Sequence, residues 1–395
     1  MMKLVIVSFY YDENVKSEEA LLEQHYTITG WAEALQRKGV DVTVINRFYK
    51  NNELNQNGVR YLFFKDNLGG TFSASQIPFQ FLKKIRSMNA DVIHLHHLTL
   101  SPQTLLLRML LNKETAIIIQ HHGGKAPGNF KRFIHNTIHN IADGFFFTTI
   151  EQGKEWFMDK KQYQKVMPVI EGTTFFNYKE RDKRTEPLYR NRHEAKMITG
   201  IHGSPVFLWV GRLDDNKDPL TVLNGFEILL NDFKDANLYM IYSDERLLNQ
   251  IKKKCESNPV LQSHVFLLGK IAHEKIEAYY NSADYFVLGS HYEGSGYALS
   301  EALRCGCVPI VTDIPSFRMM TNNGGLGSLW QADDAASFAL STIKTLKKSL
   351  ANERKSCIDF YNDALSFDAI AEKAITHYQT VIMKRRKITP ALSNA

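Results

Sequence analysis

Two series of short, continuous apolar runs constrain the fold of this 395-residue chain more than any other feature. Such runs are typical of parallel strands buried on both faces of a sheet, whereas a half-exposed strand alternates apolar and polar residues. The first series comprises "KLVIVS" (3–8), "DVTVIN" (41–46), "DVIHLHH" (91–97), "AIIIQHH" (116–122), "GFFFTT" (144–149) and "KVMPVI" (165–170). The second comprises "PVFLWVG" (205–211), "NLYMIYS" (237–243), "HVFLLGK" (264–270), "DYFVLGS" (284–290) and "VPIVTD" (308–313).

Helical patterns separate these runs. The segment "YTITGWAEALQRKG" (26–39) has apolar residues at helical spacing and ends on a glycine. The segment "DPLTVLNGFEILLND" (218–232) begins with Asp218 as an N-cap and Pro219 at the first helical position. Strand, helix and strand therefore alternate in both halves of the chain, which predicts two doubly wound α/β domains.

The length also favours two domains, because one hydrophobic core rarely grows beyond about 250–300 residues. A polar, charged stretch broken by Gly and Pro lies near the middle of the chain. We expect an N-terminal domain at 1–172, a linker at 173–203 and a C-terminal domain at 204–366. A long helix begins the last segment, 367–395, and is expected to return to the N-terminal domain.

The composition excludes several classes of protein. The net charge of +6 is mild and does not demand nucleic acid, but it suits an acidic small ligand or an anionic membrane face. No apolar run is long enough to span a membrane, and the N-terminus predicts a first strand rather than a signal peptide. The basic segment "MKRRK" (383–387) is expected at a solvated helix end. Because no cysteines form a CxxC pair, we expect buried thiols and a cytoplasmic location.

The segment "EGSGYALSE" (293–301) places two carboxylates around the start of a predicted helix. Free backbone N–H groups and the positive end of the helix dipole form an anion site there. Glu293 lies in the loop, and Glu301 lies on the apolar stripe of the helix, where an unpaired carboxylate is costly. Paired hydroxyl groups of a ligand could satisfy Glu301. Arg304, one turn further on, is the alternative partner.

A second cluster, "VGRLDDNKDPL" (210–220), also lies between a predicted strand and a predicted helix. The guanidinium of Arg212 and the ammonium of Lys217 can converge on one diphosphate from such a loop. The alternative is a surface salt bridge to a neighbouring aspartate, namely Asp214, Asp215 or Asp218.

Together with residues 268–313, these two motifs closely resemble the group 1, family-four retaining nucleotide-sugar glycosyltransferases of the GT-B fold. The hallmark of that family is a Glu-x7-Glu motif, which Glu293 and Glu301 match. The resemblance is strong over 205–313 and fair over the rest of the chain. It implies two Rossmann-like domains that face each other across a cleft, with the C-terminal helix crossing back to the N-terminal domain.

The resemblance also implies roles for individual residues, without a metal or a cofactor. Arg212 and Lys217 would neutralise the donor diphosphate as the glycosidic bond breaks. Glu293 would hold hydroxyls of the donor sugar, and Glu301 would bind the ribose hydroxyls. Further donor contacts would come from Gly211, Lys270, Ile271, Gly294, Ser295, Gly296 and Tyr297.

The implied reaction moves a sugar from a nucleotide-diphosphate sugar to a hydroxyl with retention of configuration. A UDP-sugar is the favoured donor and a GDP-sugar the alternative. The acceptor would be a glycan, a lipid-linked sugar or a small molecule, as in polysaccharide, lipopolysaccharide or glycolipid assembly. Peripheral contact with the inner face of the membrane is compatible with the basic surface, and no nucleic acid partner is expected.

Histidines at the ends of two predicted strands mark the N-terminal half, which should carry the acceptor. Relatives often have a His-Gly pair after the second of these strands, matched by His122 and Gly123, with His121 as a near alternative. The resemblance places such a histidine near the donor sugar. The first of the two strands ends in His94, His96 and His97, which we expect at the cleft. For each histidine a purely structural role is the alternative.

The loop after the first strand departs from the family, because residues 9–30 lack the usual Gly-Gly pair. His25, just before the first helix, could replace those backbone contacts with a side chain. A sugar-nucleotide epimerase and a non-catalytic sugar-nucleotide binding protein remain alternatives. A NAD-dependent oxidoreductase is disfavoured, since no G-x-G-x-x-G follows the first strand.

Overall fold

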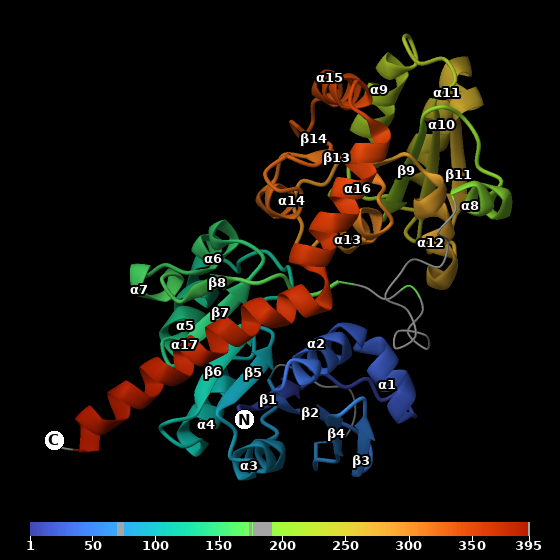
Figure 1. Cartoon of the computed structure of the whole chain (residues 1–395). Coiled ribbons are helices and arrows are strands. Elements are labelled where there is room, and N and C mark those ends of the chain that lie inside the picture. The colour runs from blue at the N-terminus through green and yellow to red at the C-terminus, as the bar shows by residue number, and fades with distance from the viewer. Residues whose placement is uncertain (69–74, 174–175, 177–191, 394–395) are drawn as a thin grey trace. The chain divides into compact units, whose positions relative to one another are not determined.

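The computed structural model describes residues 1–68, 75–173, 176 and 192–393 (Figure 1). The chain divides into two compact units. Unit 1 is Met1–Gly172 with Ser366–Ala395, and unit 2 is Thr173–Leu365. Each unit contains one mainly parallel sheet with helices packed on it, which confirms the predicted pair of doubly wound α/β domains. The last helix belongs to unit 1, as predicted.

Within the described residues, the sheet of unit 1 has the strand order β3-β4-β2-β1-β5-β6-β7-β8. Its neighbouring strands are parallel except for the antiparallel pair β3–β4. The strands are β1 (Lys3–Ser8), β2 (Asp41–Arg47), β3 (Asn52–Gln56), β4 (Val59–Phe64), β5 (Val92–His96), β6 (Ala116–Gln120), β7 (Gly144–Phe147) and β8 (Val166–Pro168). The helices are α1 (Glu18–Gln24), α2 (Tyr26–Arg37), α3 (Phe79–Ser87), α4 (Ser101–Leu110), α5 (Asn129–His139), α6 (Ile150–Trp156), α7 (Lys160–Tyr163) and α17 (Phe367–Ser393).

The two faces of this sheet are covered by different helices. On one face, alternate strand residues such as Val5 and Ile93 join a core with Phe81 of α3 and Leu107 of α4. On the other face, α17 packs on α2 and on β6. This double burial explains why the strands are continuous apolar runs.

A buried polar contact fixes α17 to the sheet. The Tyr378 hydroxyl and His94 Nδ1 are hydrogen-bonded at 2.8 Å, and both side chains are fully buried. The His94 ring also packs edge-on against Trp31 of α2 at 5.2 Å and against Phe146 of β7 at 5.5 Å. Burial lowers the pKa of His94 to about 3, so this histidine is a neutral core residue.

Unit 2 has the strand order β11-β10-β9-β12-β13-β14 in its described part, and every neighbouring pair is parallel. The strands are β9 (Val206–Gly211), β10 (Asn237–Tyr242), β11 (Val265–Gly269), β12 (Tyr285–Leu288), β13 (Val308–Thr312) and β14 (Ser328–Trp330). The helices are α8 (Arg192–Thr199), α9 (Pro219–Leu229), α10 (Leu248–Glu256), α11 (Pro259–His264), α12 (His273–Ser282), α13 (Tyr297–Arg304), α14 (Pro315–Met320), α15 (Ala335–Leu346), α16 (Leu350–Phe360) and the π-helix η2 (Tyr361–Leu365).

Part of the segment expected to be a linker, 173–203, packs with unit 2. Its helix α8 contacts α12, and Arg192 forms an ion pair with Asp284. Residues 174–175 and 177–191 of that segment lie outside the described residues. The four cysteines are free and buried, as predicted.

The sequence did not reveal the strand pair β3–β4, because β3 has the polar sequence NELNQ and lies at an exposed edge of the sheet. Its turn was nevertheless visible in the sequence. Asn57 and Gly58 have positive φ angles of 50° and 77°, and Asn-Gly is the dipeptide that most favours a two-residue hairpin turn. The short edge strand β14 was also missed.

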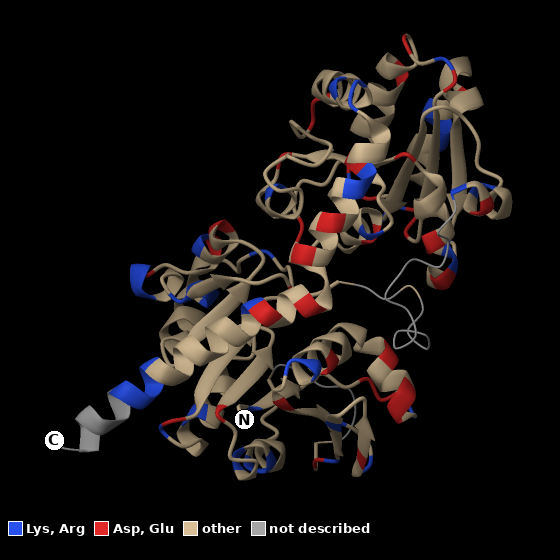
Figure 2. Ribbon diagram, in the orientation of Figure 1, with Lys and Arg blue, Asp and Glu red and all other residues tan. Residues whose placement is uncertain are grey.

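Lys and Arg gather toward the C-terminal end of α17 (Figure 2), but this basic end is not purely solvated, because two of its arginines form ion pairs. Arg385 Nη1 lies 3.2 Å from Asp143, and Arg386 Nη2 lies 2.9 Å from Asp91. These pairs tie the helix to the start of β5 and β7. No helix in the described part of the chain is long and apolar enough to cross a membrane.

The substitution Tyr378→Phe should destabilise unit 1, because it leaves the buried His94 Nδ1 without its partner. We expect a loss of about 1–3 kcal/mol in the free energy of unfolding, measured by urea denaturation. Tyr49→Phe is the matched control, since the Tyr49 hydroxyl bonds to the Lys16 carbonyl at an exposed position. Equal stability of the two variants would contradict the role given to Tyr378.

Candidate active site

The central strands β9 and β12 bring two loops together at one edge of the unit 2 sheet. The strands are parallel neighbours, so the residues that follow both of them lie at the same edge. The backbone N–H of His291 donates to the Asn216 carbonyl at 2.9 Å, and the Asn216 side chain donates to the Tyr292 carbonyl at 3.0 Å. A Cβ atom at Gly289 would lie 2.8 Å from the Asp218 carbonyl oxygen, so this close approach requires glycine.

This juxtaposition joins the two sequence motifs through an ion pair. Lys217 Nζ donates to Glu293 Oε1, and the two side chains are only 14% and 12% exposed. The Ser290 hydroxyl donates to the same carboxylate oxygen at 2.6 Å. The Glu293 carboxylate is thus held by one cation and one hydroxyl at the mouth of the loop.

Arg212 is connected to Lys217 through Asp214. Arg212 Nε lies 3.2 Å from Asp214 Oδ2, and its side chain is 56% exposed. The buried Asp214 carboxylate also accepts from the Lys217 backbone N–H at 2.9 Å and from Arg246 at 3.0 Å. The alternative salt bridge with Asp214 is therefore present for Arg212, whereas the side chain of Lys217 turns to Glu293.

The first turn of α13 follows directly after Glu293. Gly296 is the N-cap, with a positive φ of 54°, and no side chain caps the helix. The buried Ser295 and the partly buried Gly294 and Tyr297 flank it. A helix start without a capping side chain presents its first N–H groups to an anion that approaches along the helix axis.

Glu301 lies in the second turn of α13 and is 6% exposed. Its Oε1 atom is 2.8 Å from His273 Nε2, at the first residue of α12. The hydrogen bond to this carboxylate raises the pKa of His273 above its ordinary value of 6.5. Arg304, expected as the alternative partner of Glu301, has its guanidinium over the ring of Phe176 at 5.5 Å.

The remaining predicted donor contacts lie at ends of the same parallel strands. Gly211 is the last residue of β9, where an added Cβ would lie 3.1 Å from the Trp209 ring. Lys270 and Ile271 follow β11, and Ala272 separates them from helix α12, which begins at His273. These three residues therefore lie at the carboxyl edge of the unit 2 sheet, as the other predicted donor contacts do.

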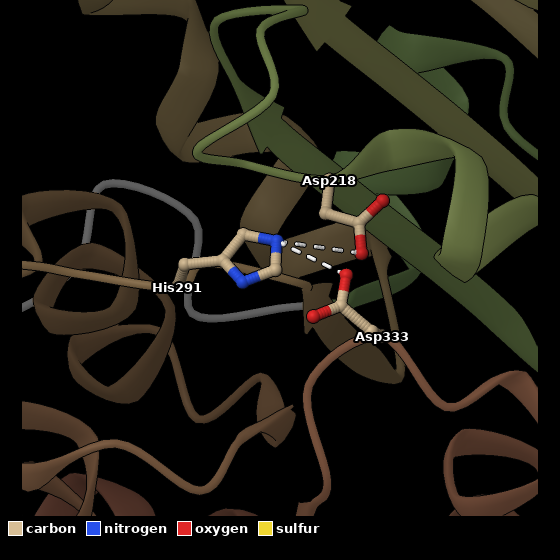
Figure 3. Close-up of side chains that lie close together, drawn as sticks. All are labelled: Asp218, His291 and Asp333. Carbon is tan, nitrogen blue, oxygen red and sulfur yellow. Dashed lines mark ion pairs between the residues drawn. The ribbon is translucent and has the colours of Figure 1, made fainter.

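Three side chains near this edge, shown in Figure 3, are close enough to hold a metal ion. His291 Nε2 lies 3.7 Å from Asp218 and 3.6 Å from Asp333. Asp218 also caps α9 by accepting from the Thr221 N–H at 3.2 Å, and Asp333 is 77% exposed. These features fit a loose ion-paired cluster as well as a metal site.

A second cluster lies at the ends of β5 and β6 in unit 1. His122 Nδ1 is 2.6 Å from Glu171 Oε1, and His122 Nε2 is 2.7 Å from His96 Nδ1. The exposed His97 packs on the His122 ring at 4.4 Å and has a positive φ of 78°, an uncommon backbone for a non-glycine residue. His25 adjoins this group from the start of α2.

The other two predicted histidines lie in the core of unit 1. His121 stacks on Phe147 at 4.6 Å, its Nε2 is 2.9 Å from the Gly124 carbonyl, and burial lowers its pKa to about 4. His94 is held by Tyr378 on the opposite face, as described above. The site thus gathers His25, His96, His97 and His122, while His94 and His121 contribute to packing.

A model of glycosyl transferases group 1 matches residues 191–361, and a model of glycosyl transferase 4-like domains matches residues 20–149. The chain belongs to the group 1 glycosyl transferases. The first model spans the strand ends that carry Lys217, Glu293 and Glu301, and the second spans the strand ends that carry the histidine cluster.

Relatives of this glycosyltransferase are distant in sequence. It is 27% identical to the mannosylfructose-phosphate synthase of Agrobacterium fabrum, over 67% of this chain and 55% of that protein. It is 24% identical to the GDP-mannose:cellobiosyl-diphosphopolyprenol alpha-mannosyltransferase of Xanthomonas oryzae pv. oryzae, over 64% of this chain and 63% of that protein. The chain therefore spans less than two thirds of the length of either relative.

The structure resembles a glycosyltransferase from Rickettsia africae with a TM-score of 0.69 and 17% identity. The match covers 96% of this chain and 98% of the other. This likeness confirms the predicted GT-B fold.

Two contacts of the glycosyltransferase were not predicted from its sequence, namely those of Glu171 with His122 and of His273 with Glu301. Glu171 lies just past β8, and the sequence does show an acid directly after the apolar run 165–170. His273 is an ordinary polar residue in the sequence, and only the folded chain brings it to Glu301. The contact of Arg212 with Asp214 is the salt bridge that the sequence offered as an alternative.

The ring of His273 should titrate above pH 6.5, because its protonated form is stabilised by Glu301. A folded pKa above the unfolded value means that the pair stabilises the fold fully below about pH 6.5 and loses that effect as pH rises through the folded pKa. NMR titration should show the midpoint falling in Glu301→Gln. Glu274→Gln, which removes a smaller contribution to the same pKa, is the control and should lower the midpoint less. An unchanged midpoint in Glu301→Gln would contradict the pairing.

Proposed function

We propose that this chain is a retaining glycosyltransferase that moves a sugar from a nucleotide-diphosphate sugar to a hydroxyl group. A UDP-sugar is the favoured donor, with a GDP-sugar as the alternative. The observation that carries the proposal is the arrangement at the unit 2 sheet edge. There the Lys217 ammonium and the Glu293 carboxylate come from adjoining loops, and helix α13 adds the Glu301 carboxylate and a start without a capping side chain.

Each part of a nucleotide sugar has a matching group in this arrangement. The diphosphate would lie against the first turn of α13, with Lys217 and Arg212 supplying positive charge that a metal ion supplies in other enzymes. The ribose hydroxyls would replace His273 as partners of Glu301, since a carboxylate accepts two vicinal hydroxyls. Glu293 would accept hydroxyls of the sugar from its position next to Lys217.

The transfer step follows from the developing charge. As the bond between the anomeric carbon and the phosphate oxygen breaks, negative charge accumulates on the leaving diphosphate. Lys217 would stabilise that charge, with Arg212 nearer to solvent. The acceptor hydroxyl would attack the same face of the sugar, form the new C–O bond and pass its proton to the departing phosphate oxygen. Entry from the same face gives retention of configuration.

The acceptor is assigned to unit 1, with the histidine cluster as its hydrogen-bonding group. In this proposal His122 is oriented by Glu171, and the exposed His97 presents its ring to the acceptor. The Xanthomonas relative has a diphosphopolyprenol-linked acceptor in its name, which supports a glycan or lipid-linked acceptor here. The free, buried cysteines support a cytoplasmic location, with peripheral contact to the inner face of the membrane.

A sugar-nucleotide epimerase is less well supported. An epimerase needs a carboxylate that is available to abstract a proton from the sugar. Glu293 accepts from Lys217 and Ser290, and Glu301 is paired with His273. Both carboxylates are thus arranged to accept hydrogen bonds from cations or hydroxyls, as sugar recognition requires.

Lys217→Ala and Glu293→Gln should each reduce nucleotide release from a panel of UDP-, GDP- and ADP-sugars by about 10²–10³-fold in kcat, the range found when one group that stabilises developing charge is removed. The Lys217 variant loses the positive charge that would stabilise the leaving diphosphate. The Glu293 variant loses a sugar contact and the partner of Lys217. The nucleotide released by the unaltered chain identifies the donor base.

Lys254→Ala is the matched control, because Lys254 forms a comparable pair with Glu227 on α10 and α9 at 3.4 Å. Its turnover should equal that of the unaltered chain. Normal turnover in both site variants would show that the donor binds elsewhere. Thermal unfolding of each variant separates a lost site from a lost fold.

A further inference from the structure

Helix α5 packs onto unit 1 through its polar residues. The buried Asn136 donates to the Trp156 carbonyl at 3.0 Å, and its Oδ1 accepts from the Met158 N–H at 2.8 Å. His139 is 1% exposed, and its Nε2 is 2.7 Å from the Leu98 carbonyl. These hydrogen bonds hold Asn136 and His139 inward and so fix which face of the helix points outward.

The outward face of α5 is apolar. Phe130 is 78% exposed, Phe133 62% and Ile134 42%, and their spacing places them on one stripe. Helix α4 packs beside α5 and adds Leu105 at 37% and Met109 at 74%. We call these five residues the α4–α5 face.

Such a face requires an explanation, because a surface helix normally turns its apolar stripe to the core and its polar residues to water. In α5 the polar side chains face the core and the apolar stripe faces water. Exposed aromatic and aliphatic side chains that gather on two adjoining helices mark a site that another surface covers.

The charges around the α4–α5 face indicate what kind of partner surface it binds. Between residues 92 and 142 the only acidic residue is Glu114. Lys113, Lys125 and Lys131 in the same stretch are exposed. The adjoining helix α6 carries charges of both signs, and α7 carries lysines (Figure 2). A second copy of the chain would oppose like cations across a two-fold interface, whereas an anionic surface complements them.

We infer that the α4–α5 face docks onto an anionic lipid membrane. The aromatic and aliphatic side chains would enter the boundary between headgroups and acyl chains, and the lysines would contact lipid phosphates. Helix α5 begins shortly after His122 and Gly123, so docking would hold the histidine cluster close to the membrane. This inference extends the proposed function to a lipid-borne acceptor, but membrane binding itself requires no transfer.

The test is flotation of the full chain with vesicles of phosphatidylglycerol and phosphatidylcholine, compared with vesicles of phosphatidylcholine alone. The site variant is Phe130→Ser with Phe133→Ser. The matched control is Met197→Ser with Ile198→Ser, because these residues are 73% and 57% exposed on α8 of unit 2. All substituted side chains are exposed, so thermal unfolding should stay unchanged.

The unaltered chain and the control should bind anionic vesicles equally and release them at high salt. The site variant should bind at least about tenfold more weakly. Equal binding by the site variant, or no binding by the unaltered chain, would overturn the inference. The inference would also be overturned if the unaltered chain and the control formed a dimer in solution and the site variant did not. Nucleotide release is measured separately, so failure to bind vesicles leaves the proposed transfer intact.

Discussion

The ion pair between Lys217 and Glu293 is the interaction on which the proposed donor site depends. The two side chains come from loops after different strands, and both are largely removed from water. Burying two charges is costly, and their attraction offsets that cost only when further hydrogen bonds are present, as with Ser290. A pair of this kind holds its cation in place until an anionic ligand replaces the carboxylate. In the proposed function this pair keeps the ammonium in place for a diphosphate.

The same principle applies at two other positions. In unit 2, His273 is hydrogen-bonded to the Glu301 carboxylate, which is the position proposed for ribose hydroxyls. In unit 1, Glu171 is hydrogen-bonded to His122. In each case a buried charged or titratable group is paired within its own unit. The GT-B scaffold supplies the geometry, because parallel strands deliver all of these residues to the carboxyl edges of two sheets.

Much of this fold was predictable from the sequence because parallel strands buried on both faces have a distinctive pattern. The apolar runs at 205–211 and 284–290 indicated the strand ends after which Lys217 and Glu293 lie. The pattern did not identify β3, which is polar, or the inverted packing of α5. The amphipathic sequence of α5 fits either orientation, and only the hydrogen bonds of Asn136 and His139 decide between them. Partners such as His273 depend on contacts between distant segments, which spacing in the sequence does not encode.

The most direct measurement is a crystal structure of the full chain with UDP bound. We predict that Lys217 leaves Glu293 and contacts a phosphate oxygen, with the diphosphate against the first turn of α13. We also predict that the ribose hydroxyls take the place of His273 on Glu301. A nucleotide bound elsewhere, with the Lys217–Glu293 and His273–Glu301 pairs intact, would contradict the assigned donor site.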